Sequence, residues 1–388
     1  MRYLGGNRLT LLTNGEQYFP ALVAALDAAQ EEIFLETYIF APDETGSLVA
    51  DALARAAARG VRVRLLIDGF GARDFAPRFR AMLEQAGARV LVYRPEVGLF
   101  DARRSRLRRM HRKLASVDAR VAFVGGINVI DDIDGPRPAP PRYDYAVRIE
   151  GPLVARVRAE AAKLWSVVSL ARLGRRGPGL RLRDERRLAA PRIRDGQRAA
   201  LLVRDNVRHR RDIEKAYLSH IGHAREEIVI ACAYFFPGRR LRHALVAAAA
   251  RGVRVVLLLQ GRVEYALQHY AARALYEPLL DAGVEIREYH LALLHAKVAV
   301  FDRKRASVGS SNIDPFSLLL AREANVFVND RAFAGELRDS IEQAMTAGAR
   351  VLPIQQWKQR PWWQRLRIRI AYVIVRLLIS FAGFEKFR

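Results

Sequence analysis

The chain contains the sequence AQEEIFLETYIF at Ala29–Phe40 and RGVRVRLLID at Arg59–Asp68, and its second half repeats both, as AREEIVIACAYF at Ala224–Phe235 and RGVRVVLLLQ at Arg251–Gln260. An alanine-rich stretch separates the members of each pair and a third β-type run follows, so each half alternates strand, helix, strand, helix, strand. The strand runs are almost continuously apolar, which is typical of sheets buried on both faces. We therefore predict an α/β fold of two pseudo-symmetric lobes, each a mostly parallel or mixed sheet flanked by helices.

Composition limits the class of protein and its partners. The chain has 388 residues and a hydrophobic fraction of 51%, enough for two domains with buried cores, which excludes general disorder. The single cysteine, Cys232, excludes a disulfide framework and a cysteine-based zinc site. A formal net charge of +24 favours a polyanionic partner, either nucleic acid or an anionic membrane surface. Residues Met1–Thr10 lack the apolar region of a signal peptide, and no uncharged apolar run of about 18 residues predicts a transmembrane helix.

The repeat divides the chain into a first lobe, residues 1–173, and a second lobe, residues 199–354. Residues 174–198 join them and hold nine arginines and three acidic residues together with Gly and Pro, so we expect a basic linker. The polar motifs described below lie around residues 105–132 and 289–316.

Residues 355–388 have no counterpart in the first half and are expected to form a C-terminal amphipathic appendage. They carry eight Lys and Arg residues, one acidic residue and seven aromatic residues. On a helix starting at Trp362, Arg365, Arg369 and Arg376 would form a narrow stripe opposite a wide apolar arc. This composition favours a membrane-associating helix that lies in a lipid interface, and packing on the protein core is the alternative.

One short polar constellation occurs in each half, and its members recur 184 residues later. A histidine and a lysine two residues apart on a strand project from the same face, about 6–7 Å apart. A glycine-rich return strand then brings an asparagine back beside the histidine. The members are His111, Lys113, Asp118 and Asn128 in the first half and His295, Lys297, Asp302, Ser310 and Asn312 in the second.

These residue types together suit a phosphate group. A lysine supplies a point charge, an asparagine and backbone N–H groups supply hydrogen-bond donors, and a histidine can serve as nucleophile or acid. We expect Asn128, Asn312 and Ser310 to bind the phosphate. If the two sets face each other, they form one site with His111 and His295 on opposite sides of the phosphorus. A metal ion is not expected, because the lysines and histidines supply the charge.

The carboxylates need separate treatment. Seven residues of extended strand span roughly 23 Å, so Asp118 and Asp302 should not touch the histidines of their own motifs. We expect them to cap a hairpin or bind neighbouring backbone. The carboxylate that orients each histidine should come from a later strand, and Glu323 and Asp144 occupy matching places in the two halves.

The motif HxKxxxxD followed by GG/GS-x-N, present twice, resembles the signature of the phospholipase D superfamily, and the resemblance extends from Asn7 to about Arg350. Within that superfamily the chain is similar to bacterial cardiolipin synthases, most of all the B type. The segments that carry this similarity are GEQYFPAL (Gly15–Leu22), MHRK (Met110–Lys113), DYAVRIEGP (Asp144–Pro152) and AYFFPGRRLRHAL (Ala233–Leu245).

The resemblance implies two phospholipase D-like lobes and a mechanism without cofactor. It makes six residues the catalytic signature positions: His111, Lys113, Asp118, His295, Lys297 and Asp302. One histidine, expected to be His111 on resemblance alone, would attack the phosphate to form a phosphatidyl-histidine while the other protonates the leaving alcohol. The partner would be an anionic phospholipid, phosphatidylglycerol, at the cytoplasmic side of the inner membrane, where the protein would bind peripherally.

The expected reaction joins two phosphatidylglycerol molecules into cardiolipin and releases glycerol. One chain carries both half-sites, so a monomer suffices. Two alternatives stay open at this point. One is a phosphodiesterase or nuclease of the same superfamily, since a net charge of +24 also suits DNA. The other is a non-catalytic basic protein that binds membrane or nucleic acid.

Overall fold

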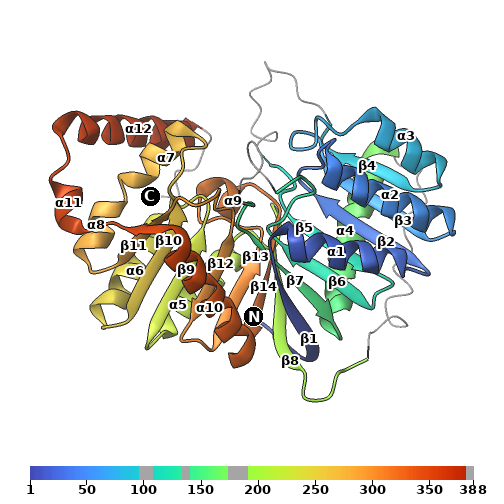
Figure 1. Cartoon of the computed structure of the whole chain (residues 1–388), viewed down its shortest axis with the longest axis horizontal. Coiled ribbons are helices and arrows are strands. Elements are labelled where there is room, and N and C mark those ends of the chain that lie inside the picture. The colour runs from blue at the N-terminus through green and yellow to red at the C-terminus, as the bar shows by residue number, and fades with distance from the viewer. Residues whose placement is uncertain (96–107, 133–139, 174–190, 382–388) are drawn as a thin grey trace.

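The computed structural model describes residues 1–95, 108–132, 140–173 and 191–381 as an α/β protein of two lobes (Figure 1). The strands of the first lobe are β1 (Leu4–Thr13), β2 (Glu32–Thr37), β3 (Arg62–Asp68), β4 (Arg89–Tyr93), β5 (Lys113–Val117), β6 (Val121–Gly125) and β7 (Tyr145–Glu150). Its helices are α1 (Asn14–Asp27), α2 (Glu44–Ala58), α3 (Pro77–Gln85) and α4 (Leu153–Leu173).

The second lobe repeats this order and adds elements at its end. Its strands are β8 (Gln197–Arg204), β9 (Glu227–Cys232), β10 (Arg254–Gln260), β11 (Glu285–Tyr289), β12 (Lys297–Phe301), β13 (Arg305–Gly309), β14 (Glu323–Asn329) and β15 (Ala349–Val351). Its helices are α5 (Asp212–His223), α6 (Arg239–Ala250), α7 (Ala266–Arg273), α8 (Tyr276–Asp281), α9 (Pro315–Leu319), α10 (Arg331–Gly348), α11 (Ile354–Lys358) and α12 (Trp362–Phe381). Residues 174–190 of the expected linker lie outside the described residues.

All strands belong to one 15-stranded sheet of order β15-β11-β10-β9-β12-β13-β14-β8-β1-β7-β6-β5-β2-β3-β4. Apart from β15, the order reads the same outward from the β8–β1 junction on both sides, as the sequence repeat requires. In each lobe the strands near the outer edge pair in parallel and those near the junction pair antiparallel. The predicted α/β fold of two lobes with mixed sheets is confirmed.

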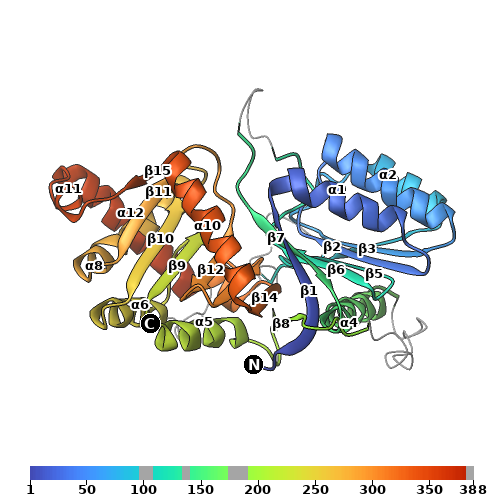
Figure 2. The same cartoon turned by 60° about the horizontal axis from the view of Figure 1, so that its bottom comes forward.

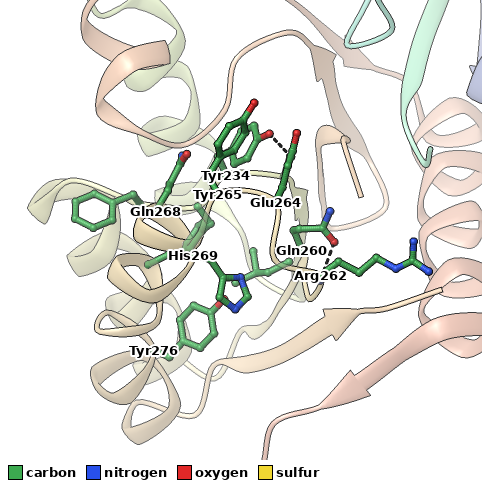
Figure 3. A pocket seen from close by; sticks show the side chains of 13 residues that line it. Tyr234, Gln260, Arg262, Glu264, Tyr265, Gln268, His269 and Tyr276 are labelled. Carbon is green, nitrogen blue, oxygen red and sulfur yellow. Dashed lines mark hydrogen bonds between the residues drawn. The ribbon is translucent and has the colours of Figure 1, made fainter. Parts of the chain in front are cut away.

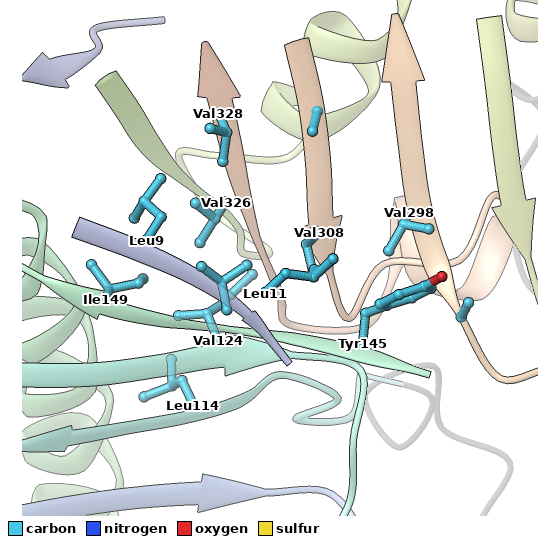
Figure 4. Packing of buried hydrophobic residues seen from close by; sticks show 14 of the residues in the cluster. Leu9, Leu11, Leu114, Val124, Tyr145, Ile149, Val298, Val308, Val326 and Val328 are labelled. Carbon is cyan, nitrogen blue, oxygen red and sulfur yellow. The ribbon is translucent and has the colours of Figure 1, made fainter. Parts of the chain in front are cut away.

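Helices cover both faces of the sheet, which explains the apolar strand runs. Figure 2 shows α1 and α2 on one face of the first lobe and α4 on the other. One hydrophobic cluster lies under α1 to α3, and a second lies under α5, α6 and α8. A third cluster joins the lobes, since it contains residues of α4, of α10 and of strands from both halves. Figure 4 shows this shared core around the junction, with Leu11 and Val124 of the first lobe near Val308 and Val326 of the second. The lobes are therefore held in a fixed relation by a continuous core.

The C-terminal segment packs on the second lobe and also exposes an apolar face. Trp357 of α11 is buried, and its ring centroid lies 5.2 Å from that of Tyr276 in α8. Helix α12 begins at Trp362 as predicted, and its buried Ala371 and Ile379 lie in a cluster with Phe236 and α7. Its opposite side exposes large apolar side chains, with 48–57% of each accessible: Leu366, Ile370, Val373, Leu377 and Leu378.

Packing on the core thus describes one face of α12, and membrane association of the exposed face stays a prediction. None of the helices in the described part of the chain combines the length and hydrophobicity needed to cross a bilayer.

Candidate active site

Each histidine of the two motifs is hydrogen-bonded to a carboxylate of the opposite lobe. His111 Nδ1 lies 3.0 Å from Glu323 Oε1, and His295 Nδ1 lies 2.6 Å from Asp144 Oδ2. The sequence singled out these two carboxylates, but it did not indicate that the pairs cross between lobes. Because a carboxylate only accepts, Nδ1 of each ring is the donor and Nε2 is left to face the site.

Backbone pairing across the junction produces this crossing. The N–H of His111 donates to the carbonyl of Arg322 at 2.9 Å, directly before Glu323. In the same way the N–H of His295 donates to the carbonyl of Tyr143 at 2.9 Å, directly before Asp144. The residue before each histidine therefore forms an isolated β-bridge with the residue before its carboxylate. These two backbone hydrogen bonds bring the two half-sites together into one site.

The two lysines are buried beside the histidines. Lys113 Nζ donates to the carbonyl of His111 at 2.7 Å, and Lys297 Nζ donates to that of His295. Lys297 also lies 3.8 Å from Asp144 Oδ2. Burial lowers the pKa of Lys113 to about 7, against the opposing effect of Glu323, and burial likewise lowers the pKa of Lys297. Two desolvated ammonium groups at one place favour an anion strongly, since an anion would offset their desolvation.

The same environment keeps the imidazoles neutral. Burial, and to a lesser extent the Lys297 ammonium, lowers the pKa of His295 to about 3. Burial and Lys113 also lower the pKa of His111. A neutral ring with Nδ1–H bonded to a carboxylate presents a lone pair at Nε2, which is the form that a nucleophile or general base requires.

The two asparagines are oriented by backbone of the neighbouring strand ends. Asn128 Oδ1 accepts from the N–H of Ile39 at 3.2 Å, and Asn312 Oδ1 accepts from that of Tyr234 at 3.4 Å. Both side chains are almost fully buried. With its oxygen held in this way, each amide has its two N–H donors left for another acceptor. This geometry supports their predicted role as phosphate donors.

Ser310 has a different role from the one expected. Its hydroxyl donates to Glu323 Oε2 and accepts from the N–H of Ala324 at 3.1 Å, inside the protein. Its side chain is fully buried, so it holds the carboxylate that orients His111 and is not placed to bind substrate phosphate. The corresponding residue of the first lobe is Gly126, where a Cβ would come within 2.3 Å of Asp144 Oδ1. The glycine is needed because Asp144 lies against the backbone there.

Asp118 and Asp302 lie away from the histidines, although the family resemblance implies that they are catalytic. The Asp118 carboxylate accepts from three successive backbone N–H groups, those of residues 30–32, each at 2.8 Å. Asp302 accepts from the N–H groups of residues 225–227. Both aspartates have a φ near +50°, in the tight turn that links two strands. They fix the far end of each motif hairpin, as the strand length predicted.

Tyr38 is a site residue that the sequence analysis missed. Its ring centroid lies 4.9 Å from that of His111, and the Lys113 ammonium lies 5.2 Å from its ring. Burial raises the pKa of the Tyr38 phenol to about 12, so it stays a hydrogen-bond donor. Its place directly after the repeated strand signal was the available clue. In the described part of the chain no three His, Cys, Asp or Glu side chains are grouped as metal ligands would be.

Comparison with known proteins agrees with this geometry. A family model described as "Cardiolipin synthase, PLD-like domain" matches residues 22–164 and 217–345. The chain is 40% identical over 380 residues to cardiolipin synthase B of Escherichia coli (strain K12), covering 97% of this chain and 90% of that protein. It is 30% identical over 386 residues to cardiolipin synthase A of Pectobacterium carotovorum subsp. carotovorum (strain PC1), covering 96% and 76%.

A solved structure has the same fold. Phosphatidylserine synthase of Haemophilus influenzae Rd KW20 matches with a TM-score of 0.68 and 14% identity, over 97% of this chain and 96% of that one. The family match therefore covers both lobes, and the structural likeness concerns the fold alone.

Proposed function

Because the chain belongs to the family of cardiolipin synthases with phospholipase D-like domains, we propose that it is a phosphatidyltransferase that joins two phosphatidylglycerol molecules into cardiolipin and releases glycerol. The observation that carries the proposal is the pair of crossed histidine–carboxylate contacts, which gather two imidazoles, two ammonium groups and two amides at one place. This set is built for a phosphodiester attacked from one side and released on the other.

In the first half of the reaction the donor phosphodiester lies between the two histidines. Lys113 and Lys297 neutralise its charge, and Asn128 and Asn312 donate to its oxygens. Nε2 of one histidine attacks the phosphorus, and we assign this role to His111 by family resemblance. The bond from phosphorus to the glycerol oxygen breaks. His295, which takes up a proton when the bound phosphate anion offsets the two ammonium groups, gives that proton to the glycerol oxygen. The product is a phosphatidyl-histidine and free glycerol.

In the second half the roles reverse. A hydroxyl of a second phosphatidylglycerol attacks the phosphorus, its proton passes to His295, and the bond from phosphorus to the His111 nitrogen breaks. Glu323 and Asp144 hold the two rings in place and stabilise the positive charge that each ring carries in turn. Since one chain supplies both half-sites, we propose that a monomer is active.

The lipid substrates place the enzyme at a membrane. We propose that it binds peripherally to the cytoplasmic side of the inner membrane, through its net charge of +24 and the exposed apolar face of α12. Basic residues near an anionic surface and apolar side chains at the acyl boundary act together in such binding.

The test uses purified protein, vesicles of phosphatidylglycerol and, separately, DNA. We expect cardiolipin and glycerol in equal amounts and no DNA cleavage. His111→Ala and His295→Ala should each lower turnover more than about 10³-fold, because nucleophile and acid act as a unit. DNA cleavage without cardiolipin formation would support the nuclease alternative. Near-normal turnover in either variant would contradict the shared site.

A further inference from the structure

A hollow in the second lobe lies beside the proposed phosphate site and belongs to neither motif. It is bounded by the residues that follow β9, by the loop after β10 and by α7. Figure 3 shows Tyr234, Tyr265 and Glu264 together at one end of it and His269 and Tyr276 at the other. Because of this position, the hollow is a candidate binding place for a part of a substrate.

One buried group in the hollow lacks a partner. The Gln260 side chain is 8% exposed, and its Oε1 accepts from the N–H of Arg262 at 3.2 Å. Its Nε2 is buried and has no hydrogen-bond partner among the described residues. A buried unsatisfied N–H is costly, so a ligand oxygen that accepts from it would be favoured. Glu264 supplies an acceptor, in contrast to the donor of Gln260. Its carboxylate accepts from the Tyr234 hydroxyl and can accept from further donors.

The lining of the hollow carries charges of both signs, Arg262 and Glu264. The Arg262 guanidinium donates two of its five N–H groups to the backbone carbonyls of His290 and Leu291, each at 3.0 Å. Burial, with a smaller effect of Arg273, lowers the pKa of His269 to about 4, and this ring is neutral at pH 7. An ammonium ligand would satisfy Glu264 but could not accept from Gln260. A ligand with several hydroxyl groups satisfies both, because each hydroxyl donates and accepts.

The hollow is joined to the phosphate site through short links. The N–H of Tyr234 holds Asn312, and the N–H of Ala233 donates to the carbonyl of Ala296, between His295 and Lys297, at 2.9 Å. A polyol bound against Tyr234 and Gln260 is therefore next to the side of the site that His295 occupies.

The hollow is also next to the membrane-associating helix. Helix α7 lines it on one side and packs against α12 on the other. Phe236 lines the hollow as well, and its ring lies 5.9 Å from that of Tyr372 in α12. The headgroup of a lipid in a bilayer that contacts α12 would therefore lie close to the hollow.

We propose that this hollow binds the polyol headgroup of the acceptor lipid, with Gln260 and Glu264 as the residues that recognise its hydroxyl groups. The inference rests on the proposed phosphatidyl transfer and adds the site that presents the acceptor. By holding the attacking hydroxyl near the phosphatidyl-histidine, the hollow favours transfer to the polyol over transfer to water, which would give phosphatidic acid.

The test compares transfer with hydrolysis in the full-length enzyme. Vesicles of phosphatidylglycerol in phosphatidylcholine carry a labelled acyl chain, and cardiolipin and phosphatidic acid are measured together. We expect Gln260→Leu and Glu264→Gln each to lower the ratio of cardiolipin to phosphatidic acid about 5- to 10-fold, as loss of one hydrogen bond to the ligand implies, with donor consumption within about twofold of wild type. Tyr234→Phe, which removes only a hydroxyl, should lower the ratio less.

Glu84→Gln on the first lobe is the matched control and should leave the ratio unchanged, since Glu84 pairs with Arg80 on the surface of α3. Added free glycerol should compete with water in wild type and less well in the variants, whereas added ethanolamine should compete poorly in all. An unchanged ratio in both variants, or an equal loss of glycerol and ethanolamine transfer, would overturn the proposal. A fall in donor consumption that matches the fall in cardiolipin would also overturn it. If wild type makes no cardiolipin, the proposed function itself fails.

Discussion

The crossed carboxylates give the sharpest test of the site. In Asp144→Asn and Glu323→Gln an amide of the same shape replaces a carboxylate that contacts a histidine at 2.6 or 3.0 Å. Both carboxylates are buried, with 4% and 0% exposure, so solvent does not replace the lost charge. The imidazolium that forms during the reaction then lacks its counter-charge. We expect turnover to fall while the fold is retained.

The size of the effect follows from the separation of the charges. Opposite unit charges about 4 Å apart in an effective dielectric of about 20 interact by about 4 kcal/mol. This value corresponds to about 10³-fold in rate, because about 1.4 kcal/mol changes a rate tenfold. An amide can also turn its N–H₂ toward Nδ1 and favour the wrong tautomer, which adds to the loss.

The assay is initial-rate formation of cardiolipin from phosphatidylglycerol vesicles, with a melting curve for each variant. Asp118→Asn is the matched control, since it makes the same change at a carboxylate that touches no histidine, and its rate should stay near wild type. Asp144→Asn combined with His295→Ala should be no slower than His295→Ala alone, because the two residues act as a unit. A loss below about tenfold in both Asp144→Asn and Glu323→Gln, with the fold intact, would refute the reasoning.

Three further results are expected. Because the pKa of Lys113 is about 7, its ammonium loses its proton as pH rises above 7, so kcat/KM should fall on the alkaline side, and a pH profile of Lys113→Gln should lack that limb. Asp118→Asn should lower the free energy of unfolding by about 2 kcal/mol in urea titrations with kcat preserved, since a charged acceptor for three backbone N–H groups is lost. Val373→Ser with Leu377→Ser should weaken vesicle binding at high salt by about 2–4 kcal/mol without lowering the melting temperature, because both side chains are exposed; unchanged sedimentation would contradict a membrane role for α12.

The sequence predicts the architecture because a local sequence pattern marks each strand and helix of the repeat. Apolar runs, alanine-rich stretches and turn residues set each strand and helix, and two copies in register predict two lobes. The spacing of His111 and Lys113 likewise determines that both lie on one face of one strand. The length of the strand also predicted that Asp118 lies away from the histidine of its own motif. Its hydrogen bonds to the backbone of residues 30–32 agree with that prediction.

What the sequence could not supply depends on contacts between segments distant in the chain. The crossing of the carboxylates results from bridges such as His111 to Arg322, and no local pattern encodes the register between lobes. Ser310 was expected to be a phosphate donor because it lies in the segment Gly309–Asn312 beside the motif, yet its hydroxyl donates to Glu323. Which face of α12 is buried could not be predicted for the same reason, since burial of Ala371 depends on where α7 lies.

The two half-sites orient their histidines in the same way but with different side chains. On one side a glycine, Gly126, lets the short side chain of Asp144 approach His295 directly against the backbone. On the other side the longer Glu323 reaches His111, and Ser310 fills the place of the glycine and holds the carboxylate with its hydroxyl. Both members of the pair are larger on the His111 side, yet each pair brings a carboxylate oxygen to Nδ1 of a histidine. The two histidines consequently have unequal surroundings within a pseudo-symmetric frame, and a polyol hollow adjoins the His295 side. Such unequal surroundings favour one assignment of nucleophile and acid over the reverse, whereas two identical half-sites would catalyse both equally.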